Sequence, residues 1–280
     1  MQLLGPAQPL APLVLDSPHS GTRLPPDFGA ALSADALRDG EDCFVDALYA
    51  PAANKGIPLL AALFTRTYLD LNRHAADIDL DLLDGPWPDP HLPSGKARIG
   101  KALLWRTLDD GRPIYARRLT VAEVQHRIAH YHRPYHRQLQ ALLDAAHARF
   151  GTVLHINCHS MNAVSGVMGQ GGPGQRRADI VLGDRDGSTC SAEITARVRD
   201  FFAGCGYEVK VNDPFKGVEL VRAYANPAQG RHSLQIELNK RLYMDDSTRQ
   251  PIAHFATLQQ QLMALIDRLS TQLQRAAPSS

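Results

Sequence analysis

The segment GTVLHINCHSMNAV, residues 151–164, decides the fold of this chain. It begins as an apolar run with β-branched residues, which predicts a buried strand, and it ends in polar residues that favour a loop. His159 is therefore expected where the strand gives way to the loop. Ligands of open α/β sheets bind at this carboxyl edge, because the strand holds a side chain rigidly while the following loop leaves it accessible.

A second segment has the same pattern. The apolar run PLVLD, residues 12–16, leads into SPHSG, residues 17–21, so that His19 also follows a predicted strand. Two imidazoles from separate strands, a carboxylate from elsewhere and one open position form the usual catalytic zinc site. The alternative is that His19 and His159 are unrelated loop or buried histidines. Their matching contexts favour a shared metal site.

The composition indicates a folded globular protein. The chain has 280 residues, 44% of them hydrophobic, which is enough to bury a sizeable core. With a formal net charge of +1, the protein has no strong overall positive charge that would attract nucleic acid or an anionic membrane. The first residues lack the pattern of a secretory signal, and no apolar stretch is long enough to span a bilayer, so a soluble cytoplasmic protein is expected. The four cysteines lack a Cys-x-x-Cys spacing, which argues against a thiolate zinc site and a disulfide framework.

The order of apolar patterns predicts one domain over residues 1–280, with a three-layer α/β/α fold around a mixed, largely parallel sheet. Asp- and Pro-rich residues interrupt this order at about 74–100 and are interpreted as a loop excursion, of the kind that forms lids or binding loops. Besides the central segment, strands are expected at residues 12–16, 59–64, 178–184, 207–211 and 234–238. Helices are expected at residues 34–50, with a break at Gly40 and an end at Pro51, and at 119–150, 191–203 and 252–274.

The carboxylate ligand of the metal is expected in the helical segment 34–50. Three acids lie there, Glu41, Asp42 and Asp46, and we choose Asp42. The other two remain open alternatives, because an ordinary solvated helix face would also account for acids at this spacing.

Glu237 lies within the largely apolar strand LQIEL. A carboxylate in such a strand is costly unless it is paired or faces a cleft. It is predicted to be the general base for the attacking water and then the proton donor to the leaving amine. The alternatives are a solvent-facing carboxylate and a structural ion pair with Lys240 or Arg241.

Several polar residues are candidates for holding an anionic substrate, because guanidinium groups bind carboxylates through two parallel hydrogen bonds. Arg66 is in addition a candidate for stabilising the oxyanion, and Asp70 for orienting an arginine or a metal-binding histidine. The alternative for each arginine is an ordinary surface cation. The candidates for substrate binding are Arg66, Asn72, Arg73 and Arg222.

Two other kinds of site are not supported by the motifs. The glycine-rich residues 166–174 precede a predicted strand rather than a helix, and the chain lacks a complete phosphate-binding motif, so these glycines are interpreted as a flexible active-site loop. Serines lie beside His19 and His159, but a Gly-x-Ser-x-Gly nucleophile elbow does not occur.

Five motifs together resemble the N-formylglutamate amidohydrolase family. They are SPHSG at 17–21, TRTYLDLNR at 65–73, CHSM at 158–161, NDPFKG at 212–217 and GRHSLQIELNK at 230–240, and they follow the family's order. The resemblance implies a zinc-exopeptidase-like α/β fold and hydrolysis of N-formyl-L-glutamate to glutamate and formate in histidine degradation. It also implies a metal set of His19, Asp42 and His159, with Glu237 as the catalytic carboxylate.

Three positions depart from the family's pattern. Val218 stands where a second glycine is common, Ala225 replaces a glycine, and Cys158 precedes His159 where other residues are usual. These changes leave the expected metal ligands and base intact and lie in segments expected to shape the substrate pocket. The expected partner is therefore a small acidic N-acyl amino acid. The alternatives are a zinc carboxypeptidase, an amidase for another N-acyl amino acid or peptide, and an inactive carboxylate-binding homologue.

Overall fold

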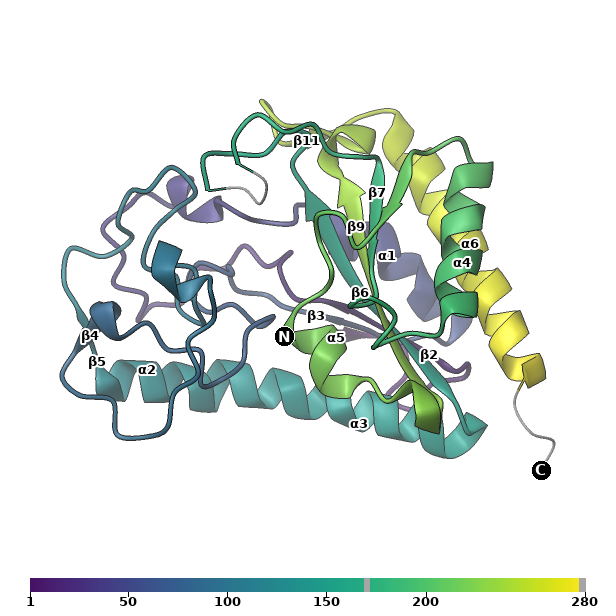
Figure 1. The fold of residues 1–280 in the computed structure, drawn as a ribbon, viewed down its shortest axis with the longest axis horizontal. Helices are drawn as coiled ribbons and strands as arrows, with labels where there is room; N and C mark the ends of the chain where they lie inside the picture. Colours follow the sequence, from purple (N-terminus) through teal and green to yellow (C-terminus); the bar gives the residue numbers. More distant parts are fainter. Residues whose placement is uncertain (169–171, 277–280) are drawn as a thin grey trace.

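Figure 1 shows the protein as a computed structural model that describes residues 1–168 and 172–276. Its centre is a seven-stranded sheet with the strand order β1-β3-β2-β6-β9-β7-β8. The run β3-β2-β6-β9 is parallel, whereas β1 is antiparallel to β3 and β7 is antiparallel to β9. This is the mixed, largely parallel sheet that was predicted. The strands are β1 (Gln2–Leu4), β2 (Leu13–Ser17), β3 (Leu59–Ala61), β6 (Val153–Met161), β7 (Ile180–Gly183), β8 (Val209–Val211) and β9 (Arg231–Asn239).

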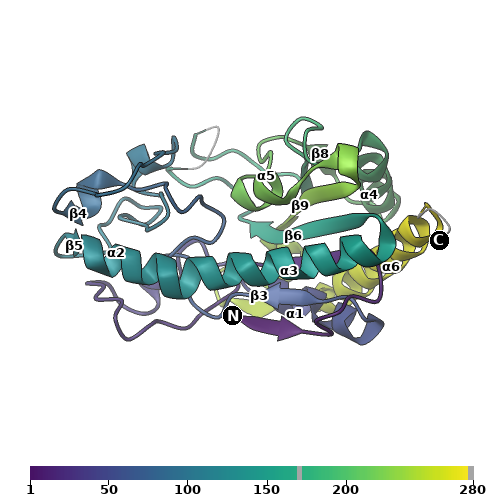
Figure 2. The ribbon, with the colours of Figure 1, turned by 90° about the horizontal axis from the view of Figure 1, so that it is seen from below.

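Helices cover both faces of this sheet (Figures 1 and 2). One face packs against α1 (Val45–Tyr49), α4 (Ala192–Gly204) and α6 (His254–Ala276), and the other packs against α3 (Arg133–Phe150) and α5 (Glu219–Tyr224). These contacts confirm the three-layer prediction. None of the helices in the described part of the chain is long and apolar enough to cross a membrane.

The predicted long helix before the central strand is confirmed. It consists of α2 (Val121–Arg127), a π-helical turn at Ile128–His132, and α3, and it follows the short strand β5 (Leu119–Thr120). The Thr120 side chain accepts a hydrogen bond from the backbone N–H of Glu123, and the Glu123 carboxylate accepts one from the backbone N–H of Thr120, so that two otherwise unpaired N–H groups are satisfied.

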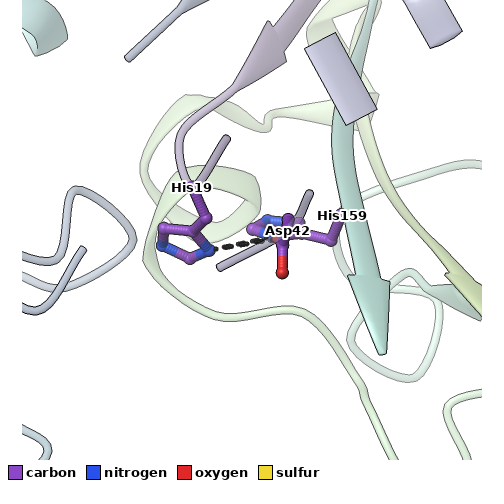
Figure 3. A group of neighbouring side chains, drawn as sticks. All are labelled: His19, Asp42 and His159. Carbon is purple, nitrogen blue, oxygen red and sulfur yellow. Dashed lines mark hydrogen bonds and ion pairs between the residues drawn. The ribbon is translucent and has the colours of Figure 1, made fainter. Parts of the chain in front are cut away.

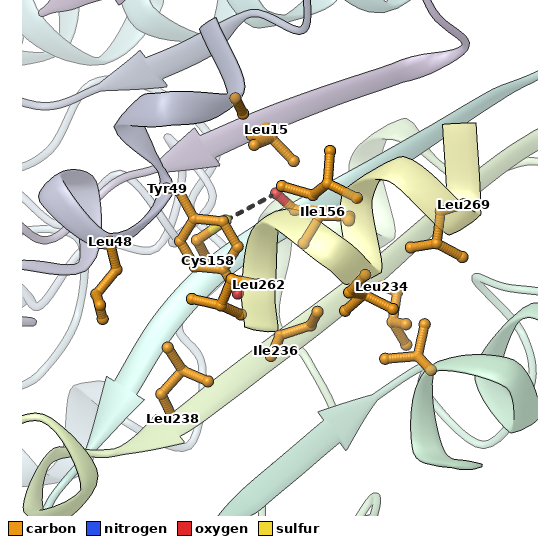
Figure 4. Close-up of a cluster of buried hydrophobic side chains, with 14 of the residues drawn as sticks. Leu15, Leu48, Tyr49, Ile156, Cys158, Leu234, Ile236, Leu238, Leu262 and Leu269 are labelled. Carbon is orange, nitrogen blue, oxygen red and sulfur yellow. Dashed lines mark hydrogen bonds between the residues drawn. The ribbon is translucent and has the colours of Figure 1, made fainter. Parts of the chain in front are cut away.

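Side chains alternate between the two faces along β6 and β9, and this alternation separates apolar from polar residues. The apolar side chains pack against α1, α4 and α6 (Figure 4). On β6 they are Leu154, Ile156 and Cys158, and on β9 they are Leu234, Ile236 and Leu238. The polar residues between them point to the other face of the sheet, at its carboxyl edge.

Two predictions about element boundaries are wrong. β6 continues to Met161, so His159 lies inside the strand rather than at the start of a loop. In the helical segment 34–50 the expected break at Gly40 is confirmed, but a second interruption at Phe44 was not predicted; Gly40 and Phe44 have positive φ values of 70° and 61°. Two short elements form there, the 3₁₀ helix η1 (Ala36–Arg38) and the α-helix α1. The chain then continues through a second 3₁₀ helix, η2 (Ala50–Lys55), which contains Pro51, the residue expected to end the helix.

The predicted excursion is longer than expected. Residues 62–118 contain only short elements between β3 and β5, whereas the expected range was 74–100. Figure 2 shows β6 running toward this segment, which lies beyond the carboxyl edge of the sheet. The short elements there are η3 (Leu80–Leu82), β4 (Leu83–Asp84) and η4 (Ala97–Ile99); those elsewhere are η6 (Pro227–Gln229), η7 (Lys240–Leu242), β10 (Met244–Asp245) and β11 (Gln250–Pro251).

The packing of α6 on the sheet predicts a large loss of stability for Leu262→Ala. Leu262 is fully buried in the apolar cluster, so the substitution removes buried methyl groups and leaves a cavity. We expect the free energy of unfolding, measured by urea denaturation, to fall by about 2–5 kcal/mol. The matched control is Leu92→Ala, because Leu92 is 67% exposed and the same change there should cost less than about 0.5 kcal/mol. Equal losses for the two variants would contradict the assigned core.

Candidate metal centre

Three side chains from separate segments converge at the carboxyl edge (Figure 3). His19 follows β2, Asp42 lies in the loop before α1, and His159 lies on β6. The Nδ1 atoms of His19 and His159 are 3.2 Å apart, and Asp42 Oδ2 lies 2.9 Å from His159 Nδ1 and 3.4 Å from His19 Nδ1. All three side chains are buried, with exposed fractions of 1–3%. The structure therefore brings together the three predicted ligands.

The outer nitrogens of both imidazoles have acceptors. His19 Nε2 lies 2.7 Å from Asp70 Oδ1, and His159 Nε2 lies 2.8 Å from the side-chain oxygen of Asn157. A carboxylate and an amide oxygen can only accept, so each Nε2 carries the proton and each Nδ1 presents a lone pair. Two lone pairs and a carboxylate at these distances repel one another unless a cation lies between them. The donor set thus fits a divalent metal ion.

The protonation preference of His159 agrees with this arrangement. Burial lowers the pKa of His159, and Asp42, which would accept a hydrogen bond from the protonated ring, only partly opposes this shift. The lowered pKa favours the neutral imidazole, which is the form that binds metals.

Asp42 is distinguished from the other two acids of its segment by its contacts. Its backbone N–H donates to the carbonyl of His19 at 3.1 Å, which brings the loop against the first histidine. Glu41 instead forms an ion pair with Arg38 at 2.6 Å, and Asp46 accepts from the N–H of Ala47. Only Asp42 of these three belongs to the group of potential ligands.

A cavity of about 420 Å³ adjoins the metal group. The predicted residues that line it are His19, Asp42, Arg66, Asn72, Arg73, His159 and Glu237. Arg222, in contrast, is not among the described residues of the cavity lining. Its guanidinium is half exposed and pairs with Glu219 on the same turn of α5, at 2.8 Å. The structure thus unites the predicted site except for this arginine.

Glu237 lies on β9 directly opposite His159 in the parallel register. It is 8% exposed, and its carboxylate accepts a hydrogen bond from the Gln235 side chain at 2.8 Å. Burial and the neighbouring charge of Asp42 raise the pKa of Glu237 well above its ordinary value, although Arg66 and Lys240 oppose the shift. A carboxyl group with a raised pKa can both take up and release a proton near neutral pH.

The ion pair that was the alternative for Glu237, with Lys240 or Arg241, does not form among the described residues. Arg241 pairs with Asp179 at 2.5 Å, and Lys240 has no carboxylate oxygen of those residues within 4 Å. Glu237 therefore faces the cavity without an ion-pair partner from residues 1–168 and 172–276.

Asp70 contacts both kinds of residue that it was expected to orient. Besides His19, its carboxylate accepts from Arg66 Nη2 at 2.8 Å and from Trp105 Nε1 at 3.2 Å. The Arg66 guanidinium also donates to the carbonyl of Gly40 and lies over the Trp105 ring. These contacts hold Arg66 at the wall of the cavity, beside the metal group.

Asn72 and Arg73 are held mainly by the backbone. Asn72 accepts from the N–H of Leu220 at 2.9 Å, and its side-chain nitrogen lies 3.3 Å from His159 Nε2. The Arg73 guanidinium donates to the carbonyls of Lys101 and Asn72, and its Nη2 is 3.8 Å from Asp70. Within the part of the chain that the structure describes, the Arg73 guanidinium thus has no carboxylate at hydrogen-bond distance.

Several cavity residues were not predicted. Gln235 lines the cavity two positions before Glu237, and Asn157, which contacts His159 from behind, lies two positions before that histidine, so the strand alternation alone could have placed both on the same face. The residues contributed by the long excursion carry no such signal in the sequence; they are Lys96, Ile99, Lys101, Trp105 and Asp109. Of the predicted glycine-rich loop, Gly166 and Met168 line the cavity, and Gly169 and Gly171 lie outside the described residues.

The comparisons with known sequences agree on one family. A family model described as N-formylglutamate amidohydrolase matches residues 11–244. The N-formylglutamate deformylase of Pseudomonas aeruginosa is 33% identical over 265 residues, which cover 92% of this chain and 91% of that protein. The protein of the same name from Pseudomonas putida is 28% identical over 271 residues, with 92% and 90% covered.

Comparison with solved structures agrees with the sequence matches. The crystal structure of an N-formylglutamate amidohydrolase from Ralstonia eutropha superposes with a TM-score of 0.92 at 45% identity and covers 99% of both chains. A gene product of Agrobacterium tumefaciens shares the fold, with a TM-score of 0.64 at 18% identity over 94% of this chain and 93% of that one. The chain therefore belongs to the N-formylglutamate amidohydrolase family and is a hydrolase of a linear amide bond.

Proposed function

We propose that this chain is a zinc-dependent deformylase that hydrolyses N-formyl-L-glutamate to L-glutamate and formate. The convergence of two histidines and Asp42 beside Glu237, in one cavity, carries the proposal. The names of the two Pseudomonas relatives support the same substrate. A place in histidine degradation and a cytoplasmic location, both expected from the sequence, are part of this proposal.

His19, Asp42 and His159 would hold the zinc ion, because two imidazole nitrogens and one carboxylate oxygen are a usual ligand set of catalytic zinc. Zinc at this site would polarise the amide carbonyl and lower the pKa of water toward 7. Asp70 and Asn157 fix the ring orientation and the tautomer of the two histidines through their outer nitrogens.

Glu237 supplies the proton transfers in this proposal. It takes a proton from the water as the oxygen attacks the formyl carbon, and it returns a proton to the glutamate nitrogen as the C–N bond breaks. Its raised pKa suits the second of these steps. Arg66, held by Asp70, is placed to stabilise the negative charge that develops on the carbonyl oxygen.

The charge of the cavity supports an acidic substrate. Among the described residues that line it, cationic side chains outnumber acidic ones. The cations are Arg66, Arg73, Lys96, Lys101, Arg177, Lys216 and Lys240, and the acids are Asp42, Asp109 and Glu237. We propose that Arg73, together with Asn72, binds a carboxylate of the substrate, and we withdraw Arg222 from this role because Glu219 pairs with it.

Formate release from N-formyl-L-glutamate tests the proposed function. The protein is purified, its zinc is quantified, and formate is measured with and without removal of the metal by a chelator. We expect turnover that is lost on chelation and restored by added zinc. Zinc binding without formate release would refute the proposed substrate, and turnover on another N-acyl amino acid or release of C-terminal residues from peptides would identify the alternative.

The ligand assignment predicts that Asp42→Ala loses zinc. The substitution removes the anionic member of the ligand set, so zinc content after dialysis, measured by mass spectrometry, should fall from about one ion per chain to less than about a tenth. Asp46→Ala is the matched control and should retain its zinc, because the Asp46 carboxylate accepts from the backbone of its own helix. Loss of zinc in the control alone would show that the wrong acid has been chosen.

The base assignment predicts that Glu237→Gln retains zinc but loses activity. Glutamine preserves the shape of the side chain and cannot accept the proton, so kcat should fall by about 10²- to 10⁴-fold. Glu193→Gln, an exposed change on α4, controls for the substitution and should leave kcat unchanged. If Glu237→Gln kept more than a tenth of the activity at full zinc content, a role as general base would be excluded.

A further inference from the structure

The cations that line the cavity differ in whether an acid neutralises them. Arg66 pairs with Asp70, and Lys101 pairs with Asp109. Lys216, at the rim, likewise pairs with Asp186 at 2.8 Å. These three positive charges already have partners in the folded chain, so they leave little charge for a ligand.

Lys240 lines the same cavity and lacks such a partner. It is 9% exposed, and its ammonium forms no hydrogen bond or ion pair with any residue in the described ranges 1–168 and 172–276. An ammonium has three N–H donors, and in Lys240 none of the three has an acceptor among the described residues. An anionic group that enters the cavity would supply the missing acceptor.

The backbone around Lys240 is held firmly. Lys240 is the first residue of η7, directly after β9. The preceding Asn239 is fully buried, and its side chain donates to the carbonyl of Ala178 at 3.0 Å and accepts from the N–H of Arg241. The lysine thus starts from a fixed point at the carboxyl edge, three residues after Glu237.

Lys240 and Arg73 reach the cavity from different segments. Arg73 lies beside Asp70, which contacts the outer nitrogen of His19 after β2. Lys240 follows β9, which is separated from β2 by β6 in the sheet. Two mostly buried cations that come from separate segments and line one cavity match the two carboxylates of a dicarboxylic substrate.

We propose that Lys240 binds one carboxylate of the substrate and, with Arg73, makes the cavity selective for N-acyl amino acids that carry two carboxylates. This inference rests on the proposed deformylase function. It adds a residue that determines specificity, and it assigns the excess positive charge of the cavity to the second carboxylate.

The experiment compares zinc-loaded wild type and Lys240→Met on three substrates. They are N-formyl-L-glutamate and its two monoamides, N-formyl-L-glutamine and N-formyl-L-isoglutamine, each of which lacks one of the carboxylate charges. We expect Lys240→Met to lower kcat/KM for N-formyl-L-glutamate by about 10- to 100-fold, the range for a hydrogen bond between charged groups. For one monoamide the variant and the wild type should differ by less than about twofold, because the partner of Lys240 is already missing.

Two further variants control for folding and for charge. Lys55→Met makes the same substitution at a surface lysine that pairs with Asp267, and it should leave kcat/KM unchanged. Lys240→Arg keeps the positive charge and should preserve the preference for the dicarboxylic substrate over the two monoamides. Equal losses for all three substrates in Lys240→Met would overturn the inference, since Lys240 would then act on Glu237 or on folding. No loss on any substrate would overturn it as well.

A binding measurement separates this inference from the proposed function. Calorimetric titration of the zinc-loaded proteins with L-glutamate, L-glutamine and L-isoglutamine needs no turnover. If wild type released no formate, the proposed function would fail, whereas weaker binding of L-glutamate by Lys240→Met, with unchanged binding of one monoamide, would still support the carboxylate site. Binding of L-glutamate that is equal in both proteins would refute that site even if formate is released.

Discussion

β6 and β9 pair in parallel over nine residues, from Val153 opposite Arg231 to Met161 opposite Asn239. This register places His159 directly beside Glu237 at the carboxyl edge. A shift of either strand by one residue would move its functional side chain to the apolar face that packs against α1, α4 and α6. The apolar residues of the two strands hold the register, so the core on one face determines the geometry of the site on the other.

Charge neutralisation is the second constraint on this edge. Asp42 and Glu237 are 2% and 8% exposed and face one cavity, and two buried carboxylates destabilise a fold unless opposite charges or hydrogen bonds offset them. The proposed metal ion would offset the charge of Asp42. Burial and the charge of Asp42 raise the pKa of Glu237, so its environment compensates its charge less completely, and this agrees with the proton exchange proposed for it.

The parts of the site that lie on regular strands could be predicted from the sequence, because strand ends and side-chain alternation follow from local patterns. His159 and Glu237 are of this kind, and His19 follows directly after such a strand. In the segment 34–50 the break at Gly40 could be predicted, whereas the loop around Asp42 could not, since the chain there follows the backbone contact between Asp42 and His19 rather than the helical pattern of its side chains. The position of Arg222 outside the cavity could not be predicted either, because it depends on where α5 packs in the folded chain. There its guanidinium pairs with Glu219.

Asp70 connects the metal group with the wall of the cavity. One carboxylate oxygen accepts from His19, and the other accepts from Arg66 and Trp105. Its backbone N–H donates to the carbonyl of Leu103 at 2.7 Å, so the long excursion is attached to the residue that contacts His19. Because one fully buried carboxylate holds these groups together, a displacement of the cavity wall would change the orientation of the imidazole. In the proposed function, metal affinity and the shape of the substrate pocket would therefore be coupled through Asp70.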